Sequence, residues 1–316
     1  MKRTGKILAV GVAALLAGVI VWIVGMSIID WDFTRLDSTT YTAQSYECED
    51  EIKSISVNLS SFPLTVTKGD SVALDYYEAD NSEVFVEENN GVLSVVEKYK
   101  YNPFKSGIFD FGRHSHKFAL TVVSGVTFEI NGLNGDISFD GVSFDEFSIN
   151  STNANIGFTN VEFGKLNIDV TNGDIEFKDC RVGELTIVGK NTHCEFDRLT
   201  ADSTSVNTVN ANIDIEDCKI QDLFVDATNL DITSENSEFK SFVIDGTNTD
   251  CDLKKVTLDK LSIDTVNLGA YIEIVGNESE YTVRTDGRNM PHDRTGTTDK
   301  LIELSGTNNS VKLKFV

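Results

Sequence analysis

The chain has 316 residues, and its 50 acidic and 27 basic side chains give a formal net charge of −23 at pH 7. A surface this acidic repels the phosphate backbone, which excludes most nucleic-acid-binding functions, and it attracts cations and basic partners instead.

The N-terminus has the composition of a membrane anchor. Residues 7–29 contain no charged side chain, and this length is sufficient for a helix to cross a bilayer core. Basic residues precede this stretch and Asp30 and Asp32 follow it, so the positive-inside rule places the C-terminus outside the cell. We therefore predict a cytoplasmic tip at 1–6, an uncleaved transmembrane signal anchor at 7–29 and a polar stalk at 30–46. A cleaved signal peptide is the alternative, although its apolar core is normally shorter.

The rest of the chain, residues 47–316, is organised around a repeat of nineteen residues. Each copy contains two short segments in which apolar and polar residues alternate, the pattern of strands with one buried face. Strands this short cannot bury an apolar face alone, so consecutive copies must stack. We predict an all-β fold after the single transmembrane helix: a single-stranded β-solenoid with 19-residue rungs, right-handed by the usual crossover preference.

An asparagine marks the same corner of every rung. Stacked amides can hydrogen-bond to the copies above and below, as they do in other stacked-strand structures. We expect these amides to be buried and therefore to need such partners. The predicted structural ladder consists of Asn134, Asn153, Asn172, Asn191, Asn210, Asn229, Asn248 and Asn267.

Five cysteines outside the cell would ordinarily suggest disulfides. However, Cys180 and Cys218 share one repeat position two rungs apart, and Cys194 and Cys251 share another three rungs apart. Both separations exceed the reach of a disulfide. These four residues are predicted to be small core side chains, and Cys48 is left unpaired.

The repeat register extends beyond the ladder in both directions. Phe118 precedes Ile137 by nineteen residues and predicts a rung directly before it, while residues 47–97 are expected to form less regular opening rungs. Val311 follows Ala270 by one rung plus an insertion. Insertions are therefore expected near 97–117 and 276–300, and in solenoids they form loops on one face.

The insertion near 97–117 is the basic, aromatic-rich stretch of an otherwise acidic ectodomain. Such side chains favour contact with an anionic membrane surface or an anionic envelope polymer. A loop folded over the end of the solenoid is the alternative. The candidate surface-contact residues are Lys98, Tyr99, Lys100, Tyr101, Lys105, Phe109, Phe111 and Arg113.

A column of carboxylates is a weak candidate for a metal site. Asp226, Asp245 and Asp264 recur at one outward position of consecutive rungs, and Asp231 and Asp250 recur nearby. Stacked carboxylates repel one another unless a cation, a proton or a base offsets their charge, and Ca²⁺ binds such oxygen-rich clusters. A solvated acidic face is the alternative, and we expect no other cofactor.

No catalytic residues are predicted. The aspartates follow the repeat, whereas glycan-cleaving enzymes need two carboxylates at a defined separation, and no Ser-His-Asp set stands out among the 4 histidines. We therefore predict a protein that is not an enzyme. An enzyme acting on envelope polysaccharides is the competing hypothesis, and a passive spacer is the third.

The anchor, the acidic β-rich ectodomain and the units Gly135-Asp136-Ile137 and Gly173-Asp174-Ile175 resemble a bacterial membrane-anchored "putative adhesin" domain of unknown function. Similar anchored proteins occur beside cell-envelope stress regulators in Gram-positive bacteria. The resemblance covers about residues 47–316, although Ala154-Asn155-Ile156 shows that the glycine is not required. It implies a β-helical cell-surface module that binds or scaffolds, either adhesin-like or accessory to envelope-stress sensing, and it supplies no catalytic residues. Its expected partners are the cell membrane and either an envelope polymer or a membrane protein, with no nucleic acid.

Overall fold

A computed structural model describes residues 3–28, 30–31, 41–60, 63–79, 82–99 and 117–316. The chain divides into two compact units. One contains helix α1 (Arg3–Ile28). The other comprises Ala43–Tyr77, Val84–Lys98 and His116–Val316, and it holds the solenoid.

Helix α1 is apolar around its circumference. Its stretch Val10–Ile28 has 19 residues with a mean hydropathy of 2.3, which is enough by length and composition to cross a membrane. Side chains on different faces, such as Leu15 and Val21, are 67% and 72% exposed, whereas a helix of a soluble protein buries one apolar stripe. A membrane anchor and a signal sequence both have this character.

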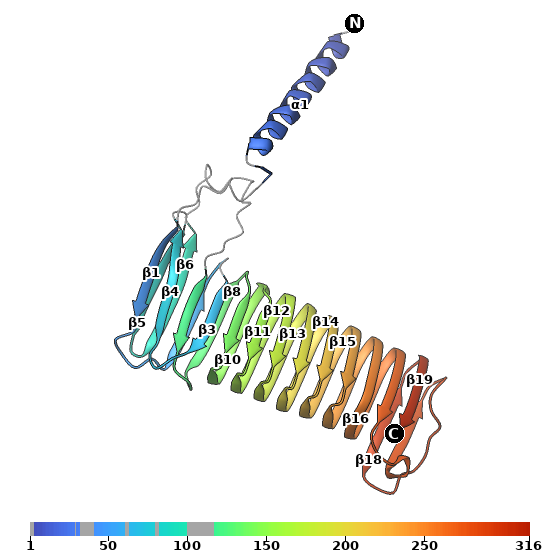
Figure 1. Cartoon of the computed structure of the whole chain (residues 1–316). Coiled ribbons are helices and arrows are strands. Elements are labelled where there is room, and N and C mark those ends of the chain that lie inside the picture. The colour runs from blue at the N-terminus through green and yellow to red at the C-terminus, as the bar shows by residue number, and fades with distance from the viewer. Residues whose placement is uncertain (1–2, 29, 32–40, 61–62, 80–81, 100–116) are drawn as a thin grey trace. The chain divides into compact units, whose positions relative to one another are not determined.

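In the described residues, nineteen strands form one sheet that winds into a solenoid (Figure 1). The opening strands are β1 (Tyr41–Glu47), β2 (Ser54–Asn58), β3 (Leu64–Lys68), β4 (Ala73–Ala79), β5 (Ser82–Asn89) and β6 (Val92–Tyr99). The middle strands are β7 (Phe118–Val122), β8 (Thr127–Leu133), β9 (Ile137–Asp140), β10 (Ser143–Asn153), β11 (Ile156–Thr159), β12 (Glu162–Lys178) and β13 (Arg181–Asp197). The last strands are β14 (Thr200–Glu216), β15 (Lys219–Glu235), β16 (Glu238–Ile274), β17 (Tyr281–Asp286), β18 (Lys300–Ser305) and β19 (Asn308–Phe315), with the 3-10 helix η2 (Glu278–Glu280) before β17.

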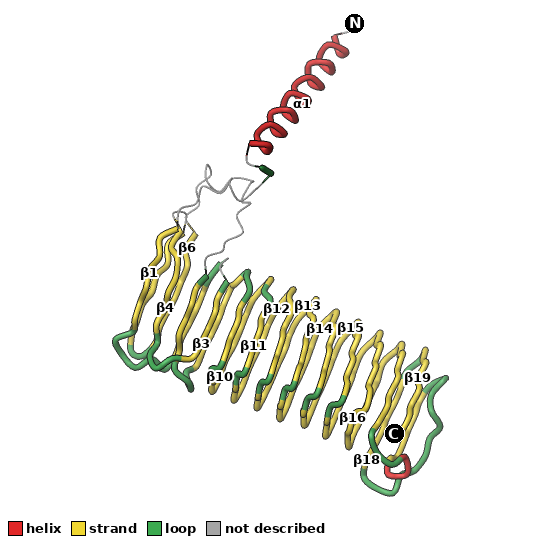
Figure 2. Tube along the Cα trace, viewed as in Figure 1, coloured by secondary structure: helices red, strands yellow, loops and turns green. Residues whose placement is uncertain are grey.

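Successive rungs pair in parallel and in register. Leu166 of β12 pairs with Leu185 of β13, and Val206 of β14 pairs with Val225 of β15, in each case nineteen residues along the chain. Only short loops separate the strands along the body of the solenoid (Figure 2). These pairings confirm the predicted β-solenoid with nineteen-residue spacing.

The core is a set of columns in which identical or similar side chains stack. Phe139, Phe158 and Phe177 are each almost fully buried, and their ring centroids lie 5.1 and 4.8 Å apart in successive rungs. Parallel offset rings at this spacing add to the free energy of apolar burial. The inward-facing half of the alternating sequence pattern therefore forms one continuous apolar core.

The start of the solenoid differs from the sequential order that the sequence predicted. Ile137 pairs with Leu64 of β3, and Leu64 in turn pairs with Phe118 of β7. Strand β3 therefore lies between β7 and β9, and β2 lies in the same way between β6 and β8. An early segment of the chain is interleaved between two later ones, because its alternating residues Leu64 and Val66 match the same inward positions as Phe118 and Leu120.

The segment predicted as a second insertion, 276–300, also contains regular structure. Tyr281–Asp286 forms β17, which pairs in parallel with β18 and adds a further layer to the end of the stack. Tyr281 is fully buried, and its hydroxyl donates to the carbonyl oxygen of Leu258 at 2.9 Å. This part of the chain therefore covers the apolar core where the rungs stop.

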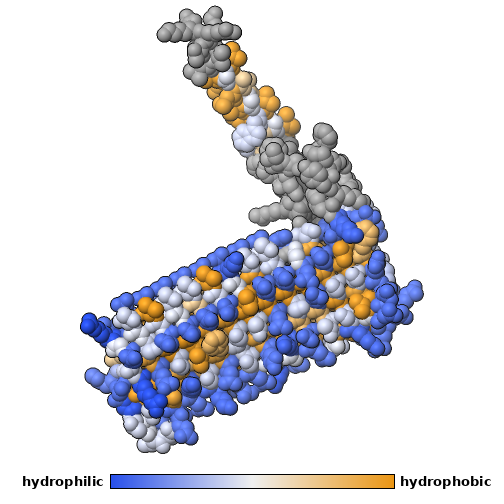
Figure 3. All heavy atoms as spheres, turned by 180° about the vertical axis from the view of Figure 1, so that it is seen from behind, coloured by the Kyte–Doolittle hydropathy of each residue, from blue (hydrophilic) through white to orange (hydrophobic). Residues whose placement is uncertain are grey.

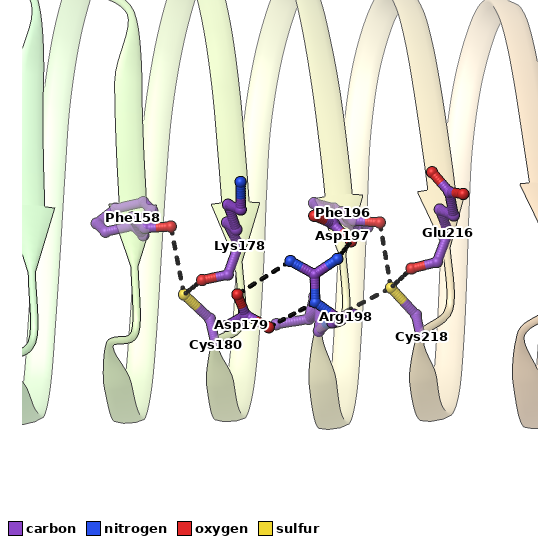
Figure 4. Close-up of polar contacts among 10 residues, drawn as sticks. Phe158, Lys178, Asp179, Cys180, Phe196, Asp197, Arg198, Glu216 and Cys218 are labelled. Atoms are coloured by element: carbon purple, nitrogen blue, oxygen red, sulfur yellow. Dashed lines mark hydrogen bonds and ion pairs between the residues drawn. The ribbon is translucent and has the colours of Figure 1, made fainter.

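One corner of each rung has a left-handed backbone that the sequence analysis did not identify. The residues at this corner recur every nineteen positions and have φ between 51° and 68°. They are Gly141, Asn160, Asp179, Arg198, Asp217, Asn236 and Lys255. Glycine, asparagine and aspartate tolerate this conformation, whereas other residues are strained by roughly 1–2 kcal/mol. Figure 4 shows how the Arg198 guanidinium bonds to Asp179 and Asp197 at this corner.

Lys255 is the second strained residue in this column, since its φ is 51° and its ammonium lies 3.8 Å from the exposed Glu235 carboxylate. We expect Lys255→Gly to raise the free energy of unfolding by about 1 kcal/mol, because glycine removes the steric strain. Chemical denaturation measures the change. The matched control is Lys240→Gly in β16, which should lower it by about 0.5–1 kcal/mol. A lower free energy of unfolding in both variants would contradict the claim that the backbone of Lys255 is strained.

All five cysteines are free, as predicted. The thiols of Cys180 and Cys218 donate to the backbone carbonyls of Phe158 and Phe196 at 3.4 and 3.2 Å (Figure 4). Burial raises the pKa of the Cys194 thiol and of the Cys218 thiol to about 12. These cysteines are therefore unreactive core side chains, because the thiolate is the reactive form.

Candidate functional site

An elongated groove lies beside the asparagine corner of the solenoid. Its volume is about 1200 Å³, and it extends from the rung of Asp174 to the end of the stack at Ser310. Two rows of side chains flank it, separated by one row of residues that point inward. We call them the ladder row and the second row.

The ladder row is a continuous chain of amide hydrogen bonds. Each Nδ2 donates to the Oδ1 of the preceding ladder asparagine, at distances from 2.6 to 3.2 Å between Asn134 and Asn308. At the start, Asn134 donates to the backbone carbonyl of Ser60 at 3.2 Å. The bonded pairs are solvent-exposed, so the expectation of buried amides is wrong. The ladder lies on the surface, where a ligand can reach it.

The second row lies two residues after each ladder asparagine and carries polar and acidic groups. Between the rows, the inward residues Ala211, Leu230 and Leu268 are buried and give the groove an apolar floor. Figure 3 shows a comparable pattern along one face of the solenoid, where a hydrophobic stripe lies between hydrophilic side chains. The second-row residues in the groove are Asp174, His193, Asn212, Asp231, Asp250, Gly269 and Ser310.

The C-terminal end of the groove is formed by the turn after β17. Arg288 and Asn289 line it there, and the carbonyl oxygen of Asn289 accepts from the backbone N–H of Val311 at 3.4 Å. Arg288 brings a positive charge to a groove whose other charged residues are aspartates. The sequence analysis noted Arg288 only as part of an insertion, since nothing in the repeat places it beside the ladder.

Asp231 is a second-row carboxylate whose pKa is shifted by its surroundings. Partial desolvation, followed by the charges of Asp250, Asp214 and Asp252, raises its pKa. An aspartate with a raised pKa destabilises the folded chain when it is ionised. This penalty is present above the folded pKa and disappears as the pH falls through that pKa.

We therefore expect Asp231→Asn to raise the melting temperature at pH 7. This gain should vanish at about pH 3, where aspartate is protonated in both the folded and the unfolded chain. The control is Asp169→Asn, because Asp169 is exposed and pairs with the uncharged Asn150 and Val188. It should leave the melting temperature nearly unchanged at both values of pH. A gain at pH 7 that persists in acid would show that charge is not its cause.

The carboxylate column proposed as a metal site lies outside this groove. Asp226 and Asp245 pair in neighbouring rungs, and Asp245 and Asp264 line a separate hollow of about 560 Å³ that also includes Asp286. The Ser305 hydroxyl donates to the Asp264 carboxylate. Within the described part of the chain, no group of three or more acidic, histidine or cysteine side chains is arranged to hold a metal ion.

Calcium binding at this column stays a prediction from the sequence alone. If Asp226, Asp245 and Asp264 share a Ca²⁺ ion, adding the ion should raise the melting temperature, because a ligand that binds the folded state stabilises it. A melting temperature that is the same with Ca²⁺ and with a chelator would dismiss the site.

Most of the candidate surface-contact loop lies outside the described residues, including Lys100, Tyr101, Lys105, Phe109, Phe111 and Arg113. Strand β6 contains Lys98 and ends at Tyr99. The ammonium of Lys98 lies 4.5 Å from the ring centroid of Phe85, a cation–π contact within the chain. The role of the loop therefore stays a prediction.

Comparison with known families finds a match in the first part of the solenoid. The family model described as Toastrack DUF4097 aligns with residues 52–187. The matched residues hold the interleaved opening strands and the first regular rungs, and the match confirms the resemblance to a β-helical domain of unknown function. The sequence matches no curated protein.

Solved structures to which this chain is similar include proteins from Bacteroides and Parabacteroides species. A "putative adhesin" from Bacteroides fragilis is 14% identical, with 89% of this chain and 99% of that chain covered and a TM-score of 0.43. A "putative lipid binding protein" from Parabacteroides distasonis is 14% identical, with coverage of 88% and 97% and a TM-score of 0.46. A "putative adhesin" from Parabacteroides merdae is 12% identical, with coverage of 88% and 96% and a TM-score of 0.46. Likenesses this distant say nothing about what this chain binds.

Proposed function

We propose that this protein is a non-catalytic binding module, anchored in the cell membrane by α1, whose solenoid holds an extended ligand of the envelope outside the cell. The observation that carries this proposal is the groove of about 1200 Å³ along the asparagine ladder. Its polar groups recur at every rung, so it offers the same contacts repeatedly along its length. An elongated ligand can use all of them together, which multiplies weak individual contacts.

The chemistry of the two rows supports binding rather than catalysis. The second row carries the carboxylates Asp174, Asp231 and Asp250, and the facing ladder row consists of amides. Glycan hydrolysis requires two carboxyl groups on opposite sides of the scissile bond, one acting as acid and the other as base or nucleophile. Amides do not titrate, so the ladder row cannot supply the second group.

The anchored, outward orientation follows from charge. Lys2, Arg3 and Lys6 precede the apolar stretch, and all 50 acidic residues follow it, so the short basic end is the one retained in the cytoplasm. A C-terminal tag should therefore be reached by antibody on intact cells, and the protein should fractionate with membranes at its full mass of 34.8 kDa. A shorter, soluble product would show that α1 is a cleaved signal sequence.

Co-sedimentation tests the binding function. The full-length protein in a zwitterionic detergent should pellet with the insoluble envelope fraction of its host. Groove variants with bulky replacements in the second row, Asn212→Trp and Ser310→Trp, should stay in the supernatant. Full retention of these folded variants in the pellet would refute a binding role for the groove.

A deletion of residues 100–116 tests the loop separately. This deletion keeps Glu97, whose carboxylate accepts from the backbone N–H of Ser60 at 2.8 Å and is buried. Pelleting that survives the deletion supports the groove as the contact surface. Pelleting that is lost with the deletion alone assigns the contact to the loop instead.

A further inference from the structure

We propose that the ligand of the groove is a neutral, linear, 1,4-linked glycan bearing N-acetyl groups, which lies along the solenoid axis with about one sugar per rung. This inference rests on the proposed binding function and names the chemistry of its ligand. It follows from the free hydrogen-bonding groups of the two rows, from their spacing and from their charge.

The amides of the ladder row have donors and acceptors that the ladder itself does not use. Asn229 donates to Asn210 at 2.7 Å and accepts from Asn248 at 2.8 Å. A side-chain amide has two N–H donors and two acceptor lone pairs. Each interior ladder amide therefore retains one donor and one lone pair, and both are available at the exposed corner.

The second row supplies stronger acceptors opposite these amides. Asp231 and Asp250 belong to neighbouring rungs, and both line the groove. An N-acetyl group has one carbonyl acceptor and one N–H donor. Its carbonyl can accept from a ladder Nδ2, and its N–H can donate to a second-row carboxylate in a charge-assisted hydrogen bond.

The spacing of the rungs favours a glycan over an extended peptide as the ligand. Rungs recur at about 4.7–4.9 Å, whereas an extended peptide advances about 3.3 Å per residue, so its groups leave register within two rungs. A 1,4-linked pyranose advances along its chain by nearly the length of one rung. A glycan can therefore present equivalent groups to successive rungs.

The negative charge of the groove favours a neutral glycan over an anionic one. The groove contains Asp174, Asp231 and Asp250 against the single arginine Arg288, and the chain as a whole has a net charge of −23. An anionic polymer would be repelled along most of the groove. A neutral chain has no such penalty, and its acetamido groups complement both rows.

Binding by the full-length protein in lipid nanodiscs tests the assignment, with hexa-N-acetylchitohexaose as the probe and calorimetry as the readout. We expect a dissociation constant between about 1 µM and 1 mM, because the groove has repeated polar contacts but no aromatic platform among its lining residues. The two-sugar homologue should bind at least about tenfold more weakly, since it spans fewer rungs. Cellohexaose, which lacks acetamido groups, should also bind at least about tenfold more weakly.

The decisive comparison uses two double variants with the same change in charge. Asp231→Asn with Asp250→Asn replaces the proposed charged acceptors with neutral amides and should weaken hexamer binding by about tenfold or more. Asp226→Asn with Asp245→Asn alters the carboxylate column outside the groove and should leave affinity within about twofold. Equal losses in the two double variants would overturn the assignment, as would equal affinity for cellohexaose or no binding of the hexamer at about 1 mM. If the protein still pellets with the envelope fraction in that case, the binding function stands and only the ligand class fails.

Discussion

Phe158→Ala is expected to lower the free energy of unfolding by about 3–5 kcal/mol, the range for removing a buried phenylalanine. The ring is fully buried, and it stacks between Phe139 at 5.1 Å and Phe177 at 4.8 Å. Its loss opens a cavity and breaks two ring contacts in the column that holds successive rungs together. Denaturation followed by circular dichroism measures the change.

Phe224→Ala provides the matched control for this prediction. Phe224 lies on the outer surface of β15 and is 42% exposed, so its removal should alter the free energy of unfolding by less than about 0.5 kcal/mol. Similar losses in the two variants would mean that the phenylalanine column does not form the core of the stack.

A disulfide between β3 and β9 is the second large effect that we expect. Thr65 pairs with Ser138, and their hydroxyl oxygens lie 3.2 Å apart across 73 residues of sequence. Neighbouring strands hold Cα atoms within disulfide reach. Thr65→Cys with Ser138→Cys should therefore oxidise readily and stabilise the fold by about 4 kcal/mol, because it closes a long loop in the unfolded chain.

The control replaces Ala119 and Ser138 with cysteine. Ala119 pairs with Thr65 on the other side of β3, so it lies two strands from Ser138, at roughly 9.6 Å, and should not cross-link. Native thiols should not interfere, since desolvation and then the Glu88 charge raise the pKa of Cys48 to about 11 and the other four cysteines are buried. A disulfide in the control pair alone would show that the opening rungs follow sequence order.

The sequence was sufficient for the fold because one face of every rung is buried. The spacing of Ile137, Ile156 and Ile175 determines both strand period and rung length, and the recurrence of asparagine determines the corner. The interleaved opening could not be predicted in this way. Phe118 precedes Ile137 by one full repeat, yet Leu64 occupies the space between them, and residue spacing along a chain does not determine which strand lies next to which.

The candidate site could be predicted only in part from the sequence, for a similar reason. Asp231 and Asp250 are recurring carboxylates in the sequence, but the repeat does not separate them from Asp245 and Asp264, which the structure places along a different hollow. The left-handed corner could have been found, since Asn160, Asp179 and Asp217 are turn-forming residues at one repeat position. Arg288 could not have been found, because its place at the groove follows from how β17 stacks on β18.

The most direct test of the groove as the ligand surface is NMR of the asparagine side-chain amides during titration with hexa-N-acetylchitohexaose. The ladder amides of Asn210, Asn229 and Asn248 should shift together and saturate with one dissociation constant, while Asn150 and Asn207, which do not line the groove, should stay unchanged. Shifts confined to asparagines outside the groove, or a ladder that does not respond while the glycan binds, would contradict the account.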